Sequence, residues 1–377
     1  MISMRKFTKR FLILLNILVG LLFLLDCCNA FLHPDKWWYI ALLSFFFPLF
    51  LIVLLIFLIF WIFVSLRFSL ISALFLLIGW QNIHAFFGFS LAGHDFTRKD
   101  PTHIRIMTWN VRRWDEFSSK KNGINSHRLP MLDLVGRQNA DLLCFQEFSE
   151  PTDTSRSNIR FIINRLGFPY YFFSRDYRSP GRKYETGVII FSKYPIISRI
   201  QTRFNKDTLI KTESLIAADI SVQGQVVRIF TTHLQSVLFK SKDFRNVEIL
   251  QNAEDSMLEA SRSLAKKLKN ALGLRGYQAD TVRNQLDLCT FPLVICGDFN
   301  DVPNSYSYFH IRGDLQDAFV AKCFGIGRSY KQISPTLRID YILPSREFQV
   351  VQSMKLSSPY SDHNAMLTDL KLQERKR

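Results

Sequence analysis

The first quarter of the chain consists of long hydrophobic runs that no charged side chain interrupts. Three stretches of 15, 30 and 26 residues contain no Asp, Glu, Lys or Arg. Because about 20 apolar residues of helix cross a bilayer core, such runs indicate membrane spans rather than buried helices of a soluble core. The pattern predicts three transmembrane helices, at about residues 11–31, 38–64 and 67–89.

The middle stretch is longer than one span requires. A tilted helix, a kink at Pro48 or an interfacial position for the aromatic residues 37–39 would absorb the excess. A cleaved signal peptide is the alternative for the first helix, because residues 27–30 (Cys-Cys-Asn-Ala) resemble a cleavage site. The two further helices that follow at once argue against cleavage.

The charges that flank these helices predict their orientation. Four basic residues lie within residues 5–10, whereas residues 26–36 carry two acids and one base. The positive-inside rule then places the N-terminus in the cytoplasm. We expect a multi-pass protein of the cell's inner membrane. Three crossings place residues 95–377 on the extracytoplasmic side, and an even number of crossings would reverse this.

After residue 100 the hydrophobic runs become short and rich in Val, Ile and Phe, which is typical of strands. Three segments have helical spacing instead: residues 129–137, 244–273 and 278–288, with Gly273 suited to end the second helix. We therefore predict an α/β domain over residues 95–377, preceded by a membrane region over residues 1–94. The predicted strands are Ile104–Trp109, Asp141–Phe145, Tyr170–Phe173, Val188–Phe191, Leu215–Val222, Val226–Thr232, Leu293–Cys296, Ile339–Leu343 and Ala365–Leu372.

Charge separates the two parts of the chain further. The 377 residues are 48% hydrophobic, yet the formal net charge is +16. Residues 101–377 hold 40 of the 48 basic and 28 of the 32 acidic side chains, so +12 of this charge belongs to the second part. These numbers exclude intrinsic disorder, a collagen-like chain and a small disulfide scaffold. They fit a partner that carries phosphate, without choosing between nucleic acid and phospholipid.

Two further groups of residues have open interpretations. Basic side chains are frequent over residues 156–183, where they form either a rim that attracts phosphate or a solvated face. Cys144 and Cys296 lie within apolar strands and read as small buried hydrophobic residues. Cys289 and Cys323 pair only if the compartment is oxidising.

Polar side chains gather where the predicted strands begin or end. Strand ends are the usual place for ligand sites in α/β proteins, because the rigid sheet fixes groups that loops then surround. Each residue alone also fits a turn former or a satisfied core histidine, but so many at strand ends are harder to explain as turns. The residues are Asn110, Glu147, His233, Asp298, Asn300, Asp340, Asp362 and His363.

These residues lie in motifs that occur together in a fixed order. The motifs are Trp109-Asn110-Val111, Gln146-Glu147, Gly-Val-Ile-Ile-Phe-Ser-Lys-Tyr-Pro at 187–195, Thr-His-Leu-Gln-Ser at 232–236, Gly-Asp-Phe-Asn-Asp-Val-Pro at 297–303, Arg-Ile-Asp-Tyr at 338–341 and Ser-Asp-His at 361–363. In this combination, residues 103–373 resemble the endonuclease/exonuclease/phosphatase family. That family includes pancreatic-type DNases, abasic-site endonucleases, sphingomyelinases and inositol-phosphate 5-phosphatases. The resemblance implies a four-layer sandwich, two packed mixed sheets flanked by helices.

The resemblance also implies a divalent-metal site. Cleavage of a phosphodiester needs a cation on the phosphate oxygens, an aligned water and a group that stabilises the leaving oxygen. Glu147, with Asn110 and Asp362, offers the hard oxygen ligands that Mg²⁺ or Mn²⁺ prefers. The sequence has no cysteine–histidine cluster that would suggest zinc instead.

The remaining residues carry over as catalytic groups. By resemblance, His363 is a general base or a phosphate contact, and Asp340 holds its ring. Asp298 would align or deprotonate the attacking water, so the proton acceptor is either Asp298 or His363. By resemblance too, Asn300 would donate a hydrogen bond to a phosphoryl oxygen, and His233 would stabilise or protonate the departing group.

Two departures from the abasic-site endonucleases matter. Their acidic residue two positions after the asparagine is Arg112 here, and their tyrosine-bearing motif is replaced by Thr-His-Leu-Gln. The departures disfavour abasic-site repair and bring the chain closer to the sphingomyelinase and DNase branches. One or two metal ions, and a DNA, RNA, lipid or small phosphoester substrate, remain open.

The leading hypothesis is a membrane-anchored, metal-dependent phosphodiesterase that acts on nucleic acid or a phospholipid headgroup. The alternative is a catalytically inactive, membrane-tethered binding module, which has no chemical need for all of these residues. A transporter is disfavoured, because three spans with almost no internal charge offer no polar path.

Overall fold

The computed structural model describes residues 2–91, 96, 98–116, 127–204, 214–237 and 257–373. These residues form two compact units. The helical unit comprises residues 1–86, 236–277 and 302–310, and the α/β unit comprises residues 87–235, 278–301 and 311–377. The helical unit thus takes in segments beyond the predicted boundary at residues 94–95, and that boundary stays a prediction.

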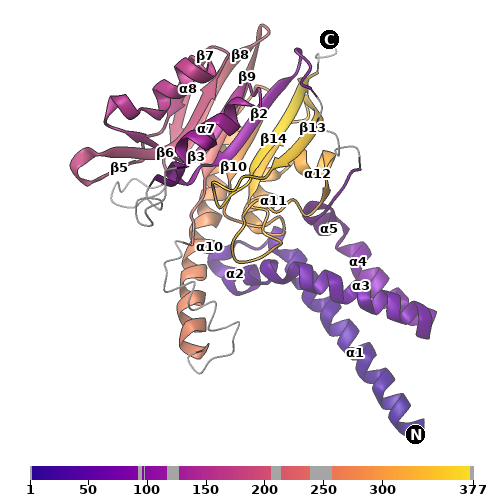
Figure 1. Cartoon of the computed structure of the whole chain (residues 1–377). Coiled ribbons are helices and arrows are strands. Elements are labelled where there is room, and N and C mark those ends of the chain that lie inside the picture. The colour runs from indigo at the N-terminus through magenta and orange to yellow at the C-terminus, as the bar shows by residue number, and fades with distance from the viewer. Residues whose placement is uncertain are drawn as a thin grey trace. The chain divides into compact units, whose positions relative to one another are not determined.

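The N-terminal part of the helical unit is a series of apolar helices (Figure 1). Two helical stretches, Lys6–Ala30 and Pro34–Val64, are long and apolar enough to cross a membrane, as the sequence predicted. The helices are α1 (Ile2–Cys27), α2 (Pro34–Ala41), α3 (Phe47–Val64), α4 (Leu66–Ile78) and α5 (Trp80–Phe86), with 3₁₀ turns at Cys28–Ala30 and Leu42–Phe46.

The third predicted span is not one straight helix. It breaks at Gly79, where α4 and α5 meet at an angle of 65°. The 13 residues of α4 rise only about 20 Å at 1.5 Å per residue, less than a bilayer core, so the third span counts only if the bent pair crosses as one element. The excess in the middle stretch is absorbed before α3, by α2 and a 3₁₀ turn, and Pro48 stands in the first turn of α3.

Helices α1 and α4 run parallel and pack closely. The Asn16 carboxamide oxygen of α1 accepts a hydrogen bond from the Ser72 hydroxyl of α4 at 3.0 Å. A Cβ atom on Gly20 would lie only 2.2 Å from the Phe75 ring, so glycine is what allows this approach. Farther along both helices, Gly79 lies against Phe23 in the same way.

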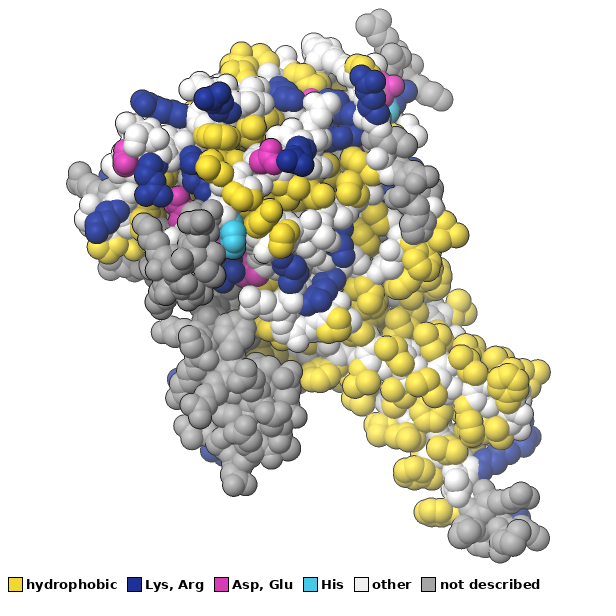
Figure 2. Space-filling model, viewed as in Figure 1, with side chains coloured by type: hydrophobic (Ala, Val, Ile, Leu, Met, Phe, Trp, Pro, Cys, Tyr) yellow, Lys and Arg dark blue, Asp and Glu magenta, His cyan; other side chains and the backbone are white. Residues whose placement is uncertain are grey.

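The outward surface of these helices is apolar. On the face that Figure 2 shows, hydrophobic side chains cover most of these helices. Phe63, Leu70 and Leu77 have exposed fractions of 85%, 67% and 72%, which is costly in water and favourable in lipid. The helices therefore have the surface of membrane-embedded elements.

Helix α10 (Met257–Asp287) contributes to the helical unit with its first part, up to Tyr277. The Tyr277 hydroxyl donates to the Asp35 carboxylate at 2.8 Å. The predicted helix end at Gly273 is wrong, because α10 continues through it and through the separately predicted helix at 278–288. Gly276 lies against His33 and Pro34, where a Cβ atom would come within 2.9 Å of the imidazole, so glycine serves close packing here rather than helix termination. Residues 244–256 of the prediction lie outside the described residues.

Two mixed sheets form the α/β unit. In the five-stranded sheet the order is β12-β10-β9-β8-β7, and only β9 and β10 are parallel. The strands are β7 (Ile196–Thr202), β8 (Leu215–Val222), β9 (Gln225–His233), β10 (Leu293–Asp298) and β12 (Asp340–Pro344).

In the seven-stranded sheet the order is β13-β14-β2-β3-β6-β4, with β5 also paired to β6, and only β2 and β3 are parallel. Every predicted strand is confirmed, and the prediction missed β7, β13 and three strands of two residues each. The strands are β2 (Ile104–Asn110), β3 (Leu142–Pro151), β4 (Tyr170–Phe173), β5 (Tyr177–Arg178), β6 (Tyr184–Ser192), β13 (Phe348–Leu356) and β14 (Ala365–Leu372), and a separate pair is β1 (Gly88–Phe89) with β11 (Phe324–Gly325).

Successive side chains of the central strands point to opposite faces of the sheet, and they form two separate hydrophobic cores. Ile104 and Ile106 of β2 face the five-stranded sheet, in one cluster with Ile229 and Val294. Met107 and Trp109 face the opposite way, in a cluster with side chains of the helices on the outer face. This arrangement confirms the predicted sandwich of packed sheets flanked by helices (Figure 1). The helices of this unit include α7 (Arg128–Gly136), α8 (Asn158–Leu166) and α12 (Ala318–Lys322), and α11 (Tyr306–Arg312) spans both units.

All six cysteines are free thiols in this structure. Cys289 contacts the Phe291 carbonyl, whereas the Cys323 thiol donates to the Ser353 carbonyl at 3.1 Å. Cys144 and Cys296 are buried in the core between the sheets, as predicted.

Candidate active site

Three of the predicted site residues lie side by side at one edge of the five-stranded sheet. Asp298 is the last residue of β10, and it pairs with His233, the last residue of β9, and with Asp340, the first residue of β12. The close spacing of β9 and β10 requires Gly297, because a Cβ atom there would lie 2.1 Å from the Thr232 carbonyl oxygen. The glycine of the Gly-Asp-Phe-Asn motif therefore sets the strand spacing that places Asp298 next to His233.

The seven-stranded sheet supplies the opposite wall. Asn110 ends β2, and Glu147 lies in β3 where the pairing with β6 shifts register between Phe145 and Phe148. At this irregularity Glu147 has a φ angle of +47°. Bulges of this kind redirect a side chain, and here the Glu147 carboxylate comes to 3.5 Å from the Asn110 amide nitrogen.

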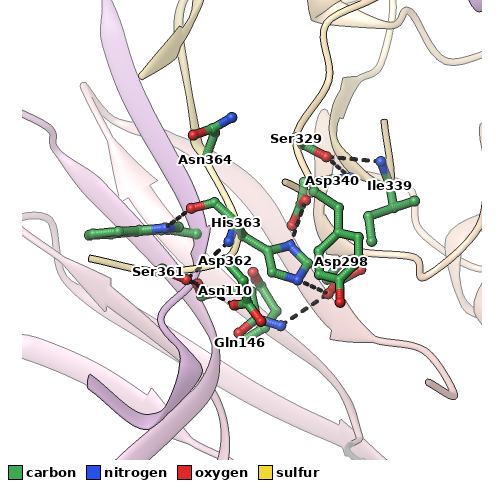
Figure 3. Close-up of polar contacts among 12 residues, drawn as sticks. Asn110, Gln146, Asp298, Ser329, Ile339, Asp340, Ser361, Asp362, His363 and Asn364 are labelled. Carbon is green, nitrogen blue, oxygen red and sulfur yellow. Dashed lines mark hydrogen bonds and ion pairs between the residues drawn. The ribbon is translucent and has the colours of Figure 1, made fainter. Parts of the chain in front are cut away.

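The Asp298 carboxylate joins the two sheets. Its Oδ2 accepts a hydrogen bond from the Asn110 amide at 3.0 Å. The same oxygen lies 3.5 Å from His233 Nε2 and 3.7 Å from His363 Nε2. Asp298 is 1% exposed, so these interactions act in a nearly water-free environment. Figure 3 shows Asn110, Asp298 and His363 converging on one point.

His363 is held in position from both ends. Its Nδ1 atom lies 2.9 Å from the Asp340 carboxylate (Figure 3). Its backbone carbonyl accepts a hydrogen bond from the Trp109 indole at 3.0 Å. Burial opposes protonation of the ring, but the carboxylates of Asp340 and Asp298 outweigh burial and raise the pKa of His363 to about 9. The structure therefore supplies a histidine whose orientation and charge are set by two buried acids.

Asn300 follows Asp298 in a loop and has a φ angle of +51°. Its backbone N–H donates to Asp298 Oδ1 at 2.8 Å, and its side-chain amide donates to the Leu234 carbonyl at 3.0 Å. These bonds fix Asn300 next to Asp298. Its predicted hydrogen bond to a phosphoryl oxygen stays a prediction.

Asp362 is connected to Asn110 through Arg112, which contacts both residues. The Arg112 backbone N–H donates to Asn110 Oδ1 at 3.0 Å, while its Nε atom lies 3.6 Å from Asp362 Oδ2. The Ser361 hydroxyl, next in sequence, donates to the Asn110 carbonyl at 2.9 Å. The three predicted metal ligands therefore border one site, in which Asn110 and Glu147 are the pair in direct contact.

The chemistry of these donors suits a hard cation. Two carboxylates and one amide oxygen are ligands that Mg²⁺ and Mn²⁺ accept. The donor atoms of Asp298, Asp340 and His363 also lie within 4.8 Å of one another. That group is fully buried, and its histidine nitrogen already engages Asp340, so its geometry suits a hydrogen-bonded relay better than a cation.

Sequence reasoning missed Tyr330. Its ring lies 4.9 Å from the His363 imidazole, and the two residues form an isolated β-bridge. Burial, with the negative charges of Asp362 and Asp298 nearby, raises the pKa of the Tyr330 phenol. Ser329, just before it, accepts hydrogen bonds from the backbone N–H groups of Ile339 and Asp340. No periodic pattern marks this segment, and only its place shortly before Arg-Ile-Asp-Tyr could have drawn attention to it.

Several of the basic residues over 156–183 are paired with acids. Arg175 and Arg178 both contact Glu185, and Arg156 lies 3.3 Å from Glu116. These ion pairs favour the solvated-face interpretation for the three arginines.

Comparison of the chain with known protein families agrees with the geometry of this site. A family model described as the endonuclease/exonuclease/phosphatase family matches residues 107–363, a range that contains every residue of this site. The chain belongs to the endonuclease/exonuclease/phosphatase family. A second model, described as a domain of unknown function (DUF8431), matches residues 9–86. Members of the endonuclease/exonuclease/phosphatase family are hydrolases that act on phosphoester bonds, typically with a divalent metal ion.

Individual relatives are distant. Nocturnin of Rattus norvegicus and Nocturnin of Mus musculus are each 23% identical over an alignment of 251 residues, and each match covers 62% of this chain and 49% of the relative. The chain thus spans about half the length of the curated relatives it matches. Among solved structures, the human Nocturnin catalytic domain with bound sulfate anion has 18% identity and a TM-score of 0.50, covering 74% of this chain and 97% of that one.

A family protein from Leptotrichia buccalis C-1013-b has 16% identity and a TM-score of 0.50, covering 71% of this chain and all of that one. These likenesses show the fold of the α/β unit. The roles of the individual site residues stay predictions.

Proposed function

We propose that this protein is a membrane-anchored, divalent-metal-dependent phosphoesterase that hydrolyses a phosphodiester of a nucleic acid or a phospholipid headgroup. The convergence of Asn110, Asp298 and His363 from two different sheets on one buried point carries the proposal. Buried carboxylates are costly unless they are paired, so an arrangement of this kind is retained where it serves chemistry. The sulfate ion named with the human Nocturnin domain supports an anion site in this fold.

In the proposed reaction, the aspartate and the two histidines of the site have different roles. In this proposal Asp298 orients the attacking water, since its carboxylate already gathers Asn110 and both imidazoles. His363, oriented by Asp340 and kept protonated by the acids around it, contacts the phosphate, and Asp298 takes the proton of the water. His233, on the other side of Asp298, protonates or stabilises the departing oxygen.

Glu147, Asn110 and Asp362 would hold the cation, Mg²⁺ or Mn²⁺. When bound, a divalent cation polarises the phosphoryl group and stabilises the negative charge that develops on its oxygens. Without it, nothing beside Glu147 and Asp362 would balance the further negative charge that develops on the phosphoryl oxygens during the reaction, which gives the proposed metal dependence a physical reason.

The helical unit supports a proposal for the side of the membrane on which the site lies. Lys9 near the start of α1 and Arg67 at the start of α4 both lie over the Phe68 ring, at 4.7 and 5.0 Å. The two parallel helices therefore begin at the same end, and the positive-inside rule places this end in the cytoplasm. Because α1 and α4 run in the same direction, we propose that the chain after α5 lies on the extracytoplasmic side. A reporter enzyme fused to the C-terminus should be active only outside the cytoplasm, and activity inside the cytoplasm contradicts this topology.

The activity is tested on the full-length protein purified in detergent. Plasmid DNA, sphingomyelin vesicles and bis(p-nitrophenyl) phosphate are incubated with Mg²⁺ or Mn²⁺. We expect hydrolysis of at least one substrate, its loss with EDTA, and its recovery when the metal ion is returned.

His363→Ala and Asp298→Ala should abolish this hydrolysis. Asp314→Ala, which removes a carboxylate that is 98% exposed, is the matched control and should leave the rate unchanged. Hydrolysis that survives EDTA, or that both active-site variants retain, contradicts the proposal. A well-folded protein with no activity on any of these esters favours the inactive binding module.

A further inference from the structure

A left-handed turn follows directly after Asn110. Residues 112–115 have φ angles between +46° and +58°, a region that residues with a side chain rarely adopt and almost never in succession. The described part of the chain contains ten non-glycine residues with positive φ, and Glu147 and Asn300 are among them. Six of the ten therefore belong to the site or border it, which is where strained backbone is retained for function.

The inner half of the turn fixes its position. The Trp114 side chain is completely buried and meets the rings of Phe145 and Phe148 edge-on, at 5.6 and 5.8 Å. Asp115, also buried, lies 2.8 Å from the His127 ring. These contacts hold the backbone in the left-handed conformation.

The outer half of the turn presents two arginines to the site. Arg112 Nε lies 3.6 Å from the Asp362 carboxylate, and Arg113 Nε lies 3.7 Å from the Glu147 carboxylate. Their side chains are 39% and 45% exposed, whereas Asp298 beneath them is 1% exposed. The guanidinium groups thus form the solvent side of the site, and the relay of histidines and Asp298 forms its buried side.

Arg112 keeps its donors available. Its side-chain contacts with described residues are ion pairs of 3.6 Å to Asp362 and 4.0 Å to Asp115, both longer than a hydrogen bond. A guanidinium has five N–H donors in a planar fork that matches phosphate oxygens. Two arginines that only balanced the charges of Glu147 and Asp362 would need neither a strained backbone nor a buried tryptophan to hold the turn. These features therefore indicate a further role for the arginines.

We infer that Arg112 and Arg113 bind the phosphate of the substrate and make the site accept a phosphate with two negative charges, as in a phosphomonoester. This inference rests on the proposed function and extends it beyond phosphodiesters. Two guanidinium groups add two positive charges beside Glu147 and Asp362. With a divalent cation also bound, the surroundings of the phosphate favour a dianion over a monoanion. An acidic residue at position 112 would have the opposite effect.

The test compares two substrates with the same leaving group, using the full-length protein in detergent with Mg²⁺. p-Nitrophenyl phosphate is a dianion, and bis(p-nitrophenyl) phosphate is a monoanion. We expect Arg112→Ala to lower kcat/KM for the monoester by about 30-fold, since a charge-assisted hydrogen bond is lost, and for the diester by less than about threefold. Arg112→Lys should restore only part of the loss, because lysine keeps the charge without the fork.

Arg137→Ala is the matched control. Arg137 is 73% exposed and pairs with Asp133 on α7, away from the site, so its removal changes the net charge equally. It should affect neither substrate. An equal loss on both substrates in Arg112→Ala, or no loss on the monoester, overturns the inference.

A binding measurement separates this inference from the proposed function. In EDTA, inorganic phosphate should raise the melting temperature of the wild type and of Arg137→Ala but not of Arg112→Ala. If the wild type hydrolyses neither ester, the proposed function fails while this measurement still tests the arginines. Equal protection of Arg112→Ala and wild type contradicts phosphate binding by the turn.

Two inhibitors with the same phosphate distinguish its source. Glycerol 3-phosphate is soluble, and lysophosphatidic acid presents the phosphate on a lipid. Inhibition by both with equal strength indicates a free phosphoester, and stronger inhibition by the lipid indicates a headgroup. In either case Arg112→Ala should weaken the inhibition, and an unchanged inhibition constant overturns the inference.

Discussion

The pair formed by Asp340 and His363 allows a quantitative prediction. Asp340→Asn keeps the size of the side chain and removes its charge. His363 Nδ1 lies 2.9 Å from Asp340 Oδ2, and both side chains are buried. With an effective dielectric constant of about 20, this separation corresponds to an attraction of about 6 kcal/mol between a protonated ring and the carboxylate.

An asparagine retains part of this interaction as a neutral hydrogen bond. It can also donate to Nδ1, which would keep the ring neutral and remove its positive charge from the site. We therefore expect a loss of about 4 to 5 kcal/mol in transition-state stabilisation, or a fall in kcat of about 10³- to 10⁴-fold. The assay is the hydrolysis of whichever ester the wild type cleaves fastest, with circular dichroism to verify the fold.

Asp369→Asn is the control for loss of a buried charge. Asp369 accepts two hydrogen bonds from the Arg105 guanidinium, at 2.6 and 2.8 Å. Arg105 lies five residues before Asn110 on β2, about 17 Å along the strand. This variant should lose about 3 to 5 kcal/mol of stability yet keep its kcat at a temperature where it is folded. If folded Asp340→Asn keeps more than a tenth of the wild-type kcat, the role assigned to Asp340 is wrong.

Three other changes have distinct expected outcomes. Glu147→Gln should weaken Mn²⁺ binding at least about tenfold by calorimetry, and unchanged affinity would remove Glu147 from the ligand set. Trp114→Ala should destabilise the α/β unit by about 3 to 5 kcal/mol in denaturant unfolding, whereas Trp114→Phe should cost much less, because it keeps a ring against Phe145. Gly20→Leu should lower the melting temperature in detergent, since the Phe75 ring occupies the space that the new side chain needs, and an unchanged value contradicts the α1–α4 packing.

The local pattern of the sequence determined much of this protein. Uncharged runs predicted the apolar helices, and short Val- and Ile-rich runs predicted the strands, because both depend mainly on neighbouring residues. The positions of Asn110, Asp298 and Asp340 at strand ends followed from the same pattern. The Gly-Asp-Phe-Asn and Ser-Asp-His motifs then indicated the family, which the match over residues 107–363 confirmed.

Tertiary packing decided the elements that local pattern described wrongly. Gly273 looked like a helix end, yet α10 runs through it, since close contact with residues 33–35 favours small residues on that face. The third membrane helix looked continuous, yet it bends by 65° at Gly79, which packs against Phe23 of α1. In both cases the partner that explains the glycine is far away in the sequence.

The site itself depends on contacts that no local pattern contains. Asn110 and Asp298 are 188 positions apart and meet only because the two sheets pack face to face, which brings the end of β2 next to the end of β10. Tyr330 joins the site through a single β-bridge to His363, and the left-handed turn at residues 112–115 exists because Trp114 is buried beneath it. The sequence alone determined which groups stand at the strand ends. The packing of the two sheets decided which of those groups share one buried point, because distances between sheets are set by the core between them.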